Sequence, residues 1–196
     1  MKCGFCKSKI IKILDLGKTP LANSFLTKRD LKKKEKTFAL TLNFCRECHL
    51  IQAPRDVKSK EIFNEKYVYF SSTSKYWTDH AQRYCKNIIK KIKLKNNSCI
   101  TEVASNDGYL LKNFVEAEIP CLGVEPTQST ADAARLIGID VLEEFFGEAL
   151  AKRIETADLI IGNNVYAHVP DINDFTKGLT ALLKPEGTIT WNGIKI

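Results

Sequence analysis

Four cysteines in the first half of the chain could hold a metal ion. Cys3 and Cys6 form one Cys-x-x-Cys pair, and Cys45 and Cys48 form a second. Two such turns can present four thiolates to one tetrahedral zinc ion at Zn–S distances near ~2.3 Å, which leaves no coordination position open for catalysis. The spacing therefore predicts a zinc ion that supports folding. The 38 residues between the pairs, 7–44, exceed the roughly 15–20 of compact zinc ribbons, so a redox pair and unligated thiols are the alternatives.

The stretch from Ile100 to Gly108 reads Ile-Thr-Glu-Val-Ala-Ser-Asn-Asp-Gly, which is typical of a strand that turns into a helix. A glycine at this bend lets the backbone approach a ligand closely. The amides at a helix N-terminus are free for polar groups of a ligand, and Asn106 and Asp107 can cap the helix. Because the motif holds a single glycine, an ordinary helix cap without a ligand is the alternative interpretation.

An acidic residue follows at the end of the next expected strand. Glu125 lies 17 residues after Gly108, and a carboxylate there can accept hydrogen bonds from both hydroxyls of a ribose. A dinucleotide is a competing ligand, but Gly-x-Gly-x-x-Gly is absent from the sequence. Phe145 and Phe146, after the third expected strand, could enclose an adenine or belong to the core.

Polar residues also gather after the fourth expected strand. Asn163, Asn164 and His168 are expected to face a ligand at the mouth of the cleft. His168 could act as a general acid or base, because an imidazole ordinarily titrates near ~6.5. A structural histidine beside a helix is the alternative.

These residues need an α/β scaffold to position them. Strands separated by helices of about ten residues predict right-handed crossovers and a parallel sheet with helices on both faces. Such a sheet binds ligands beyond the carboxyl ends of its strands, at the switch point. The expected strands are 99–104, 121–125, 139–142, 159–163 and 188–191, and the expected helices are 108–117, 128–137, 147–155 and 171–184.

The first half reads differently. Thr37–Phe44 alternates apolar and polar residues and predicts a strand that enters the second cysteine pair, whereas Leu14–Gly17 and Thr19–Ser24 are expected to form turn-rich loop. We expect a zinc-binding module at 1–70, a linking helix within 71–97 and a partial cofactor-binding domain at 98–196. The expected apolar stripe of that helix, which runs from about 74 to 93, consists of Tyr76, Trp77, His80, Tyr84, Ile88 and Ile92.

Composition and charge limit the function classes. The chain has 196 residues, 44% of them hydrophobic, without a signal peptide or a membrane-spanning run, so we expect a protein of the reducing cytoplasm. Residues 1–97 hold 23 Lys and Arg against 8 Asp and Glu, a net +15, whereas residues 98–196 hold 7 against 15, a net −8. The basic half suits an anionic partner such as a nucleic acid, a membrane surface or a phosphorylated small molecule, or it is a solvated surface.

Many of these motifs match one family in register. The chain resembles the zinc-containing sugar C-methyltransferases, S-adenosylmethionine-dependent enzymes that act on nucleotide-linked deoxysugars. The matching residues are Cys3-x-x-Cys6, Leu16-Gly17 with Pro20-Leu21-Ala22-Asn23, Cys45-x-x-Cys48-x-x-x-Gln52, Tyr69-Phe70-Ser71-Ser72, His80, Ser105-Asn106-Asp107-Gly108, Gly123-Val124-Glu125-Pro126, Phe145-Phe146 and Asn163-Asn164-Val165 through His168-Val169-Pro170-Asp171.

The resemblance implies a Rossmann-like class I methyltransferase domain after the zinc module, with a nucleotide sugar as substrate. It implies that Tyr67 or Tyr69 meets the nucleotide sugar and that His168 lies near the reacting centre. Its reaction is methyl transfer to a sugar carbon next to a keto group. The candidate contacts to S-adenosylmethionine are Glu102, Ala104, Asn106, Asp107, Gly108, Glu125, Pro126, Phe145, Asn163 and Asn164.

The sequence departs from the family at two places. Ala104 stands where the family usually has a glycine, so its methyl group either crowds the cofactor or is tolerated. The sequence ends at Thr190–Ile196, soon after the fifth expected strand, and we expect a truncated form that lacks the later acid–base residues. The alternative functions are a small-molecule O-methyltransferase and a non-catalytic fragment that binds zinc or nucleic acid. Nucleic acid is the weaker partner, because the basic residues lack interleaved stacking aromatics.

Overall fold

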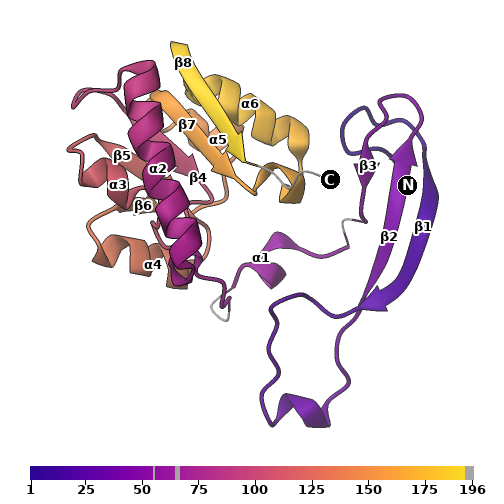
Figure 1. Ribbon diagram of the computed structural model, residues 1–196. Coiled ribbons are helices and arrows are strands. Elements are labelled where there is room, and N and C mark those ends of the chain that lie inside the picture. The colour runs from indigo at the N-terminus through magenta and orange to yellow at the C-terminus, as the bar shows by residue number, and fades with distance from the viewer. Residues whose placement is uncertain (55, 65–66, 193–196) are drawn as a thin grey trace. The chain divides into compact units, whose positions relative to one another are not determined.

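The computed structural model describes residues 1–54, 56–64 and 67–192, whose elements are labelled in Figure 1. The chain forms two compact units: Met1–Val68 with Pro170–Asn173, and Tyr69–Val169 with the residues from Asp174 onward. Within the described residues, no helix has both the length and the apolar character needed to cross a membrane.

The first unit holds a three-stranded antiparallel sheet in the order β1-β2-β3. Its strands are β1 (Ile10–Thr19), β2 (Phe38–Cys45) and β3 (Ile51–Gln52), and a short helix α1 (Ser59–Ile62) follows them. The charged run between β1 and β2 is exposed, with one short 3-10 helix at Asp30–Lys32. The strand expected at Thr37–Phe44 is thus present one residue further along.

The expectation of a loop at Leu14–Gly17 is wrong, because these residues lie inside β1. The pairing of β1 with β2 shifts register between Lys12 and Leu14 and again between Asp15 and Lys18. Gly17 takes the left-handed conformation within the second irregularity, at φ +81°. Two bulges let a strand carry a turn-like sequence, because each bulge absorbs an extra residue without ending the ladder.

The second unit is built on a five-stranded sheet in the order β6-β5-β4-β7-β8, and every pair in it is parallel. The order places the switch point between β4 and β7, which begin the two halves of the sheet. Its strands are β4 (Ile100–Val103), β5 (Cys121–Val124), β6 (Asp140–Leu142), β7 (Ala157–Asn163) and β8 (Leu183–Asn192). Its helices are α2 (Lys75–Ile92), α3 (Lys112–Val115), α4 (Gln128–Leu136), α5 (Glu148–Ala151) and α6 (Ile172–Leu182).

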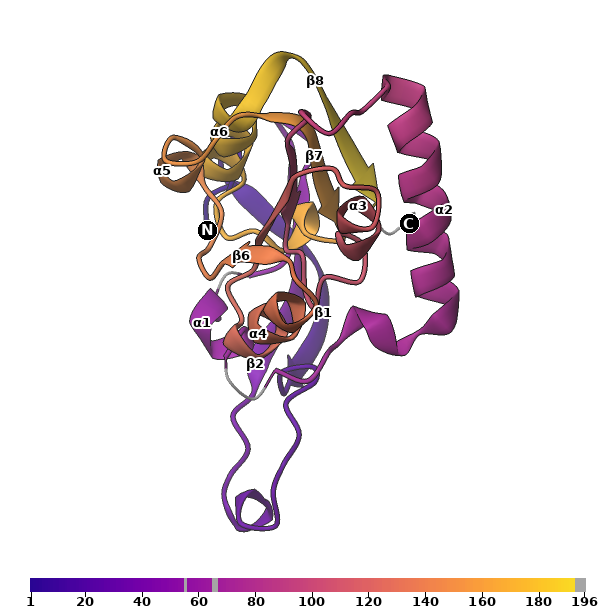
Figure 2. The same cartoon turned by 90° about the vertical axis from the view of Figure 1, so that its left-hand side faces the viewer.

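Helices cover both faces of this sheet, as predicted. Figure 2 shows α2 and α3 on one side of the sheet and α5 and α6 on the other. Strand β7 serves both cores: Leu159 and Ile161 pack in the core under α2, and Ile160 packs in the core under α6. Alternation along a strand gives each face its own apolar layer.

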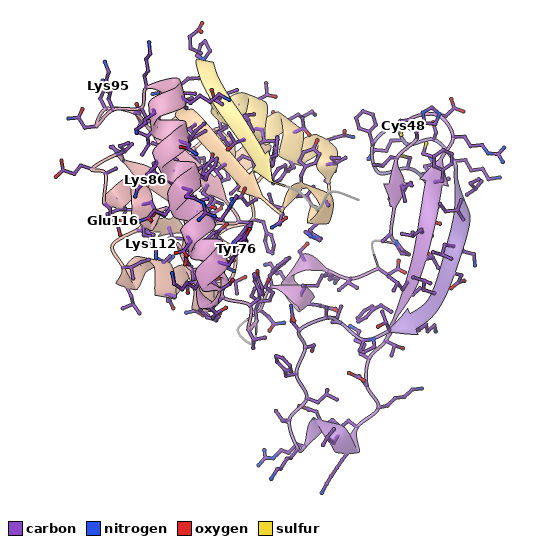
Figure 3. All side chains as sticks on the ribbon, viewed as in Figure 1. Cys48, Tyr76, Lys86, Lys95, Lys112 and Glu116 are labelled. Atoms are coloured by element: carbon purple, nitrogen blue, oxygen red, sulfur yellow. The ribbon has the colours of Figure 1, made fainter. Side chains whose placement is uncertain are left out.

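Three helices differ from expectation. The helix expected at 147–155 is only α5, because residues 152–154 form a turn and a bend instead. Helix α2 begins after Ser74, whose hydroxyl accepts a hydrogen bond from the Trp77 amide at 3.3 Å, and it ends at Lys93 in the left-handed conformation. Tyr76, labelled in Figure 3, does not join the core-facing stripe, because 76% of that residue is exposed, and His80 is exposed as well. The helix expected at 108–117 is only α3, because the residues from Gly108 to Leu111 form turns instead.

Candidate functional site

The two cysteine pairs form two turns of the same geometry. The amides of Lys7 and His49 donate to the carbonyls of Cys3 and Cys45 at 3.1 and 2.9 Å. Lys7 and His49 both take the left-handed conformation, at φ 65° and 62°. Each turn thereby presents two thiols to the same side. His49 itself is exposed and stacks on Phe44, so it is not part of the thiol cluster.

The four thiols meet at one point. Their Sγ atoms all lie within 4.8 Å of one another, with Cys3 to Cys48 at 3.6 Å and Cys6 to Cys45 at 3.4 Å. Tetrahedral Zn–S bonds of ~2.3 Å would place sulfurs about 3.8 Å apart, so the cluster fits a zinc ion. Cys3 and Cys45 are buried and Cys6 and Cys48 are partly buried. Four thiolates would fill a tetrahedral site and leave no coordination position for a substrate, which favours a structural role.

The strands explain the long gap between the pairs. Ile10, just after the first turn, is paired with Cys45, the first cysteine of the second turn. The intervening residues therefore form a hairpin that returns the chain to the first pair. Gln52 adds a bond that the sequence interpretation did not assign: its Nε2 donates to Cys3 Sγ at 3.4 Å, and its Oε1 accepts from the Gly4 amide at 2.9 Å. In the sequence, only the position of Gln52 four residues after Cys48 indicated that it could contact the cysteine cluster.

The turn after β4 has a regular backbone pattern. Ala104, Asn106 and Gly108 all take the left-handed conformation, at φ 60°, 52° and 76°. Only Gly108 does so without strain, since a Cβ in this region costs roughly 1–2 kcal/mol, and Asn tolerates it better than Ala. Gly108 also allows close packing, because a Cβ there would lie 2.3 Å from Ile139 Cδ1. The turn thus has the geometry of a loop with three alternating glycines, although its sequence shows one.

Three acidic side chains are buried around this turn. Glu102, Asp107 and Glu125 are 1%, 4% and 4% exposed. Burial, followed by the charges of Glu125 and Asp107, raises the pKa of Glu102 well above its ordinary value. Both carboxyl oxygens of Glu102 are buried without a hydrogen-bond partner among the described residues. A protonated Glu102 could donate a hydrogen bond that an ionised one could not.

Glu125 is turned toward the protein rather than into open solvent. Its Oε2 accepts from the Asn106 amide at 3.0 Å, and its Oε1 accepts from the Thr127 amide at 2.9 Å. A carboxylate has about four acceptor positions, so two remain for a ligand. The two bonds join the end of β5 to the turn after β4.

A pocket of about 240 Å³ opens beside this turn. Trp77 stacks on His80 at 5.2 Å and on Tyr109 at 6.0 Å between ring centroids. The Asn163 amide donates to the Tyr109 hydroxyl at 3.3 Å. Burial raises the pKa of Tyr84 to about 12. The pocket is lined by Trp77, His80, Ala81, Tyr84, Tyr109, Leu110, Asn163, Thr190 and Trp191.

Sequence interpretation assigned no site role to most of these lining residues. The signal for them was the three-to-four spacing of Trp77, His80 and Tyr84 on α2, which indicates a buried face but does not distinguish a pocket wall from a filled core. Of the pocket residues, only Asn163 was predicted as a cofactor contact.

The other candidate residues are more dispersed. His168 ends a short 3-10 helix (Tyr166–His168) and is exposed, as is Asn164, which is left-handed at φ 53°. Phe145 is 39% exposed, whereas Phe146 packs edge-on against Phe175 in the core under α6. Pro126 is partly buried beside Glu125.

The two candidate substrate-binding tyrosines fall in different units. Tyr67 belongs to the first unit, where its ring lies 5.4 Å from that of Phe63. Tyr69 begins the second unit, and 51% of it is exposed. The carbonyl of Tyr69 accepts from the Asn106 amide side chain at 3.0 Å, which places its backbone at the turn after β4.

The turn region is rich in oxygens that a ligand could satisfy. Buried oxygens of Glu102, Ser105, Asp107, Thr127 and Ser129 have no hydrogen-bond partner among the described residues. S-adenosylmethionine carries ribose hydroxyls and an ammonium group, both of which donate hydrogen bonds. The residues present therefore fit this cofactor at the carboxyl ends of β4 and β5, where parallel sheets bind nucleotides.

Known proteins match both parts of the chain. A family model described as "Putative zinc binding domain" matches residues 3–63. The C-methyltransferase NovU of Streptomyces niveus is 29% identical over 181 residues, which cover 90% of this chain and 43% of that protein. The ubiquinone biosynthesis O-methyltransferase of Bartonella tribocorum is 29% identical over 98 residues, which cover 47% of this chain and 39% of that protein. The chain spans less than half the length of these curated relatives.

Solved structures share the fold. The PH0226 protein of Pyrococcus horikoshii OT3 superposes with a TM-score of 0.52 at 16% identity, over 63% of this chain and 60% of that chain. DesVI of Streptomyces venezuelae superposes with a TM-score of 0.50 at 13% identity, over 63% and 53%.

The parallel sheet and the cysteine module define an α/β protein with a Rossmann-like class I methyltransferase fold after a small zinc-binding module. The similarity to NovU along nine-tenths of the chain, together with the match of residues 3–63, confirms the resemblance to the zinc-containing C-methyltransferase family.

The thiol cluster predicts that the first unit depends on zinc. Cys45→Ser should release zinc and lower the melting temperature of the first unit, because three thiolates hold the ion less tightly than four. Zinc release measured with a chromogenic chelator, followed by circular dichroism, checks this. The matched control is Cys99→Ser, a partly buried thiol outside the cluster. Equal zinc retention by both variants would contradict the assignment.

The strained turn predicts opposite effects for two similar substitutions. Ala104→Gly should raise the free energy of unfolding by about 0.5 kcal/mol, since relief of left-handed strain exceeds the entropy that glycine adds to the unfolded chain. Gly108→Ala should lower it by at least about 2 kcal/mol, because left-handed strain adds to the contact with Ile139. Urea denaturation of both variants measures the two changes in the free energy of unfolding. A loss of stability in Ala104→Gly would show that Ala104 is not strained.

The buried Glu102 predicts a pH-dependent loss of stability. Below the ordinary pKa of about 4.3 both the folded and unfolded states hold the proton. As the pH rises further, the unfolded chain ionises while folded Glu102 stays protonated, so stability falls by about 1.4 kcal/mol per pH unit until its raised pKa is reached.

Glu102→Gln should remove this slope, so the variant should match the wild type near pH 4 and exceed it at neutral pH. Urea denaturation of both proteins between pH 4 and 8 measures the difference. Glu116→Gln, at an exposed residue that directly follows α3 (Figure 3), is the control. Parallel curves for wild type and Glu102→Gln would show that Glu102 ionises normally.

Proposed function

We propose that this chain is part or all of an S-adenosylmethionine-dependent C-methyltransferase that acts on a nucleotide-linked keto-deoxysugar. The observation that carries the proposal is the left-handed turn at the switch point of the sheet, set among unsatisfied buried oxygens. It occurs in a chain similar along 90% of its length to a C-methyltransferase. The keto-deoxysugar is the acceptor implied by the family resemblance.

In this proposal the residues around the turn hold the cofactor. The turn from Asn106 to Gly108 brings its backbone against the cofactor, and Glu125 accepts from the ribose hydroxyls with its two remaining acceptor positions. The pocket walls from α2 and the end of β7 enclose the neighbouring space. When bound, S-adenosylmethionine supplies an electrophilic methyl group on a positively charged sulfur.

The four cysteines hold a structural zinc ion, and Tyr67 or Tyr69 contacts the nucleotide sugar. The diphosphate of that substrate suits the basic first half of the chain. A base removes the proton from the sugar carbon next to the keto group, and this carbon then forms a bond to the methyl group. The methyl group would come from S-adenosylmethionine, whose sulfur would keep the electron pair of the S–CH₃ bond. His168, exposed after β7, is the proposed residue near this proton transfer.

Cofactor binding tests the proposal without requiring turnover. Calorimetric titration of S-adenosylhomocysteine into zinc-loaded protein should give saturable one-to-one binding. Glu125→Ala should weaken this binding at least tenfold, because it removes the ribose acceptor and loosens the turn at Asn106. Glu116→Ala, an exposed acidic residue of the same unit, should bind like the wild type. A folded, zinc-replete protein that does not bind would refute the cofactor site.

An acceptor assay separates the remaining candidates. Methyl transfer from labelled S-adenosylmethionine to a keto-deoxysugar nucleotide, compared with transfer to phenols, distinguishes the C-methyltransferase from an O-methyltransferase. The O-methyltransferase is a candidate because of the similarity over 98 residues. A fragment that binds nucleic acid would instead show affinity that falls steeply with added salt.

A further inference from the structure

The segment that precedes α2 is tied to the turn after β4 by side chains. The Ser71 amide donates to Asn106 Oδ1 at 2.8 Å, and Asn106 Nδ2 donates to the Tyr69 carbonyl at 3.0 Å. The Ser72 amide donates to Asp107 Oδ2 at 3.0 Å. Three hydrogen bonds thus join residues 35 to 37 positions apart in the chain.

The bond from Ser71 is buried, and the other two are partly buried. Ser71, Asn106 and Asp107 are 7%, 8% and 4% exposed. A buried hydrogen bond that loses one partner leaves the other unsatisfied at a cost larger than the bond's own net worth. The segment at 69–72 is therefore held in one place as long as the turn keeps its conformation.

Asn106 is suited to this task by its residue type. Its backbone is left-handed at φ 52°, so glycine would fit the turn with less strain. A glycine, however, could neither accept from Ser71 nor donate to Tyr69. An asparagine side chain has both an acceptor and a donor, and asparagine tolerates the left-handed region better than most residues. The strained backbone of Asn106 thus allows a side chain that bonds to both Ser71 and Tyr69, which glycine could not do.

The same residue also contacts the candidate cofactor carboxylate. The Asn106 amide donates to Glu125 Oε2 at 3.0 Å. Asn106 consequently bonds on one side to the residue proposed to accept from the ribose and on the other to the segment that carries Tyr69. The Tyr69 side chain is half exposed while its carbonyl is fixed, which leaves the ring available to a ligand.

We propose that Asn106 is a positioning residue that couples cofactor binding to the placement of Tyr69 for the methyl acceptor. The inference rests on the proposed function, because it takes Glu125 as a cofactor contact and Tyr69 as an acceptor contact. Two sites joined in this way must influence each other equally. A cofactor that rigidifies the turn should therefore also rigidify residues 69–72. Loss of the three hydrogen bonds should remove this effect of the cofactor on residues 69–72.

Amide hydrogen exchange of the whole zinc-loaded chain, with and without S-adenosylhomocysteine, tests the coupling. In the wild type the cofactor product should slow exchange at Ser71 and Ser72 at least fivefold, the lower end of typical couplings. In Asn106→Gly the Ser71 amide should exchange faster, the cofactor-induced slowing should disappear, and S-adenosylhomocysteine should still bind within about tenfold of wild-type affinity. A merely structural anchor would protect these amides equally with and without the ligand.

Two further variants complete the design. Asp107→Ala, whose backbone lies outside the left-handed region, should release Ser72 and leave Ser71 protected, so the test survives if Asn106→Gly does not fold. Thr73→Ala removes an exposed bond within the same segment, from its hydroxyl to the Phe70 carbonyl at 2.7 Å, and should retain the full coupling.

The outcomes separate the two proposals. Binding of S-adenosylhomocysteine with no slowing at 69–72 would overturn the positioning role and leave the proposed function intact. Abolished binding in Asn106→Gly would also overturn it, in favour of a direct cofactor role for the Asn106 side chain. Absence of binding by the folded wild type would refute the proposed function and the coupling together.

Discussion

The chain must leave β4 and enter the next helical turn within a few residues, and it does so by placing every second residue in the left-handed region. Ala104, Asn106 and Gly108 share this conformation. Because the pattern bends the backbone sharply at the switch point, it brings the Asn106 amide to Glu125 and the Asn106 side chain to the segment at 69–72. The proposed cofactor site and the segment at 69–72 therefore depend on one strained turn, whose strain is offset by the hydrogen bonds around it.

The acidic cluster beneath this turn has a related consequence. Glu102 is fully buried on β4, and neighbouring carboxyls further oppose its ionisation. A neutral carboxyl group can be buried in such a place. An unpaired ionised one cannot, because burial raises the pKa and the group takes up a proton. The cluster then has one group that can donate and several that can accept, an arrangement that suits a ligand with both kinds of polar group. The buried Glu102 that gives the cluster its donor lowers the free energy of unfolding at every pH above the ordinary pKa of a glutamate.

The repeating pattern of apolar residues was sufficient to predict all five strands of the parallel sheet and the helix before them, because these elements bury regular faces. It failed where geometry departs from regularity. Strand β1 was missed since Leu14–Gly17 resembles a turn, and its two bulges follow from pairing with β2 rather than from local sequence. The cysteine cluster was predictable from spacing, but the hairpin that joins its halves was not. Gln52, Trp77 and Tyr109 likewise acquire their places through contacts distant in sequence.

The weakness of the Ser105–Gly108 motif as a sequence signal has a physical explanation. Glycine-rich nucleotide loops are recognised because left-handed positions usually require glycine. Here two of the three positions carry side chains. At Asn106 the side chain makes one buried and one partly buried hydrogen bond that compensate for the strain. A search that counts glycines alone therefore fails to identify this loop. A search for such sites should therefore admit asparagine wherever a left-handed residue at the end of a strand can also bond a neighbouring segment.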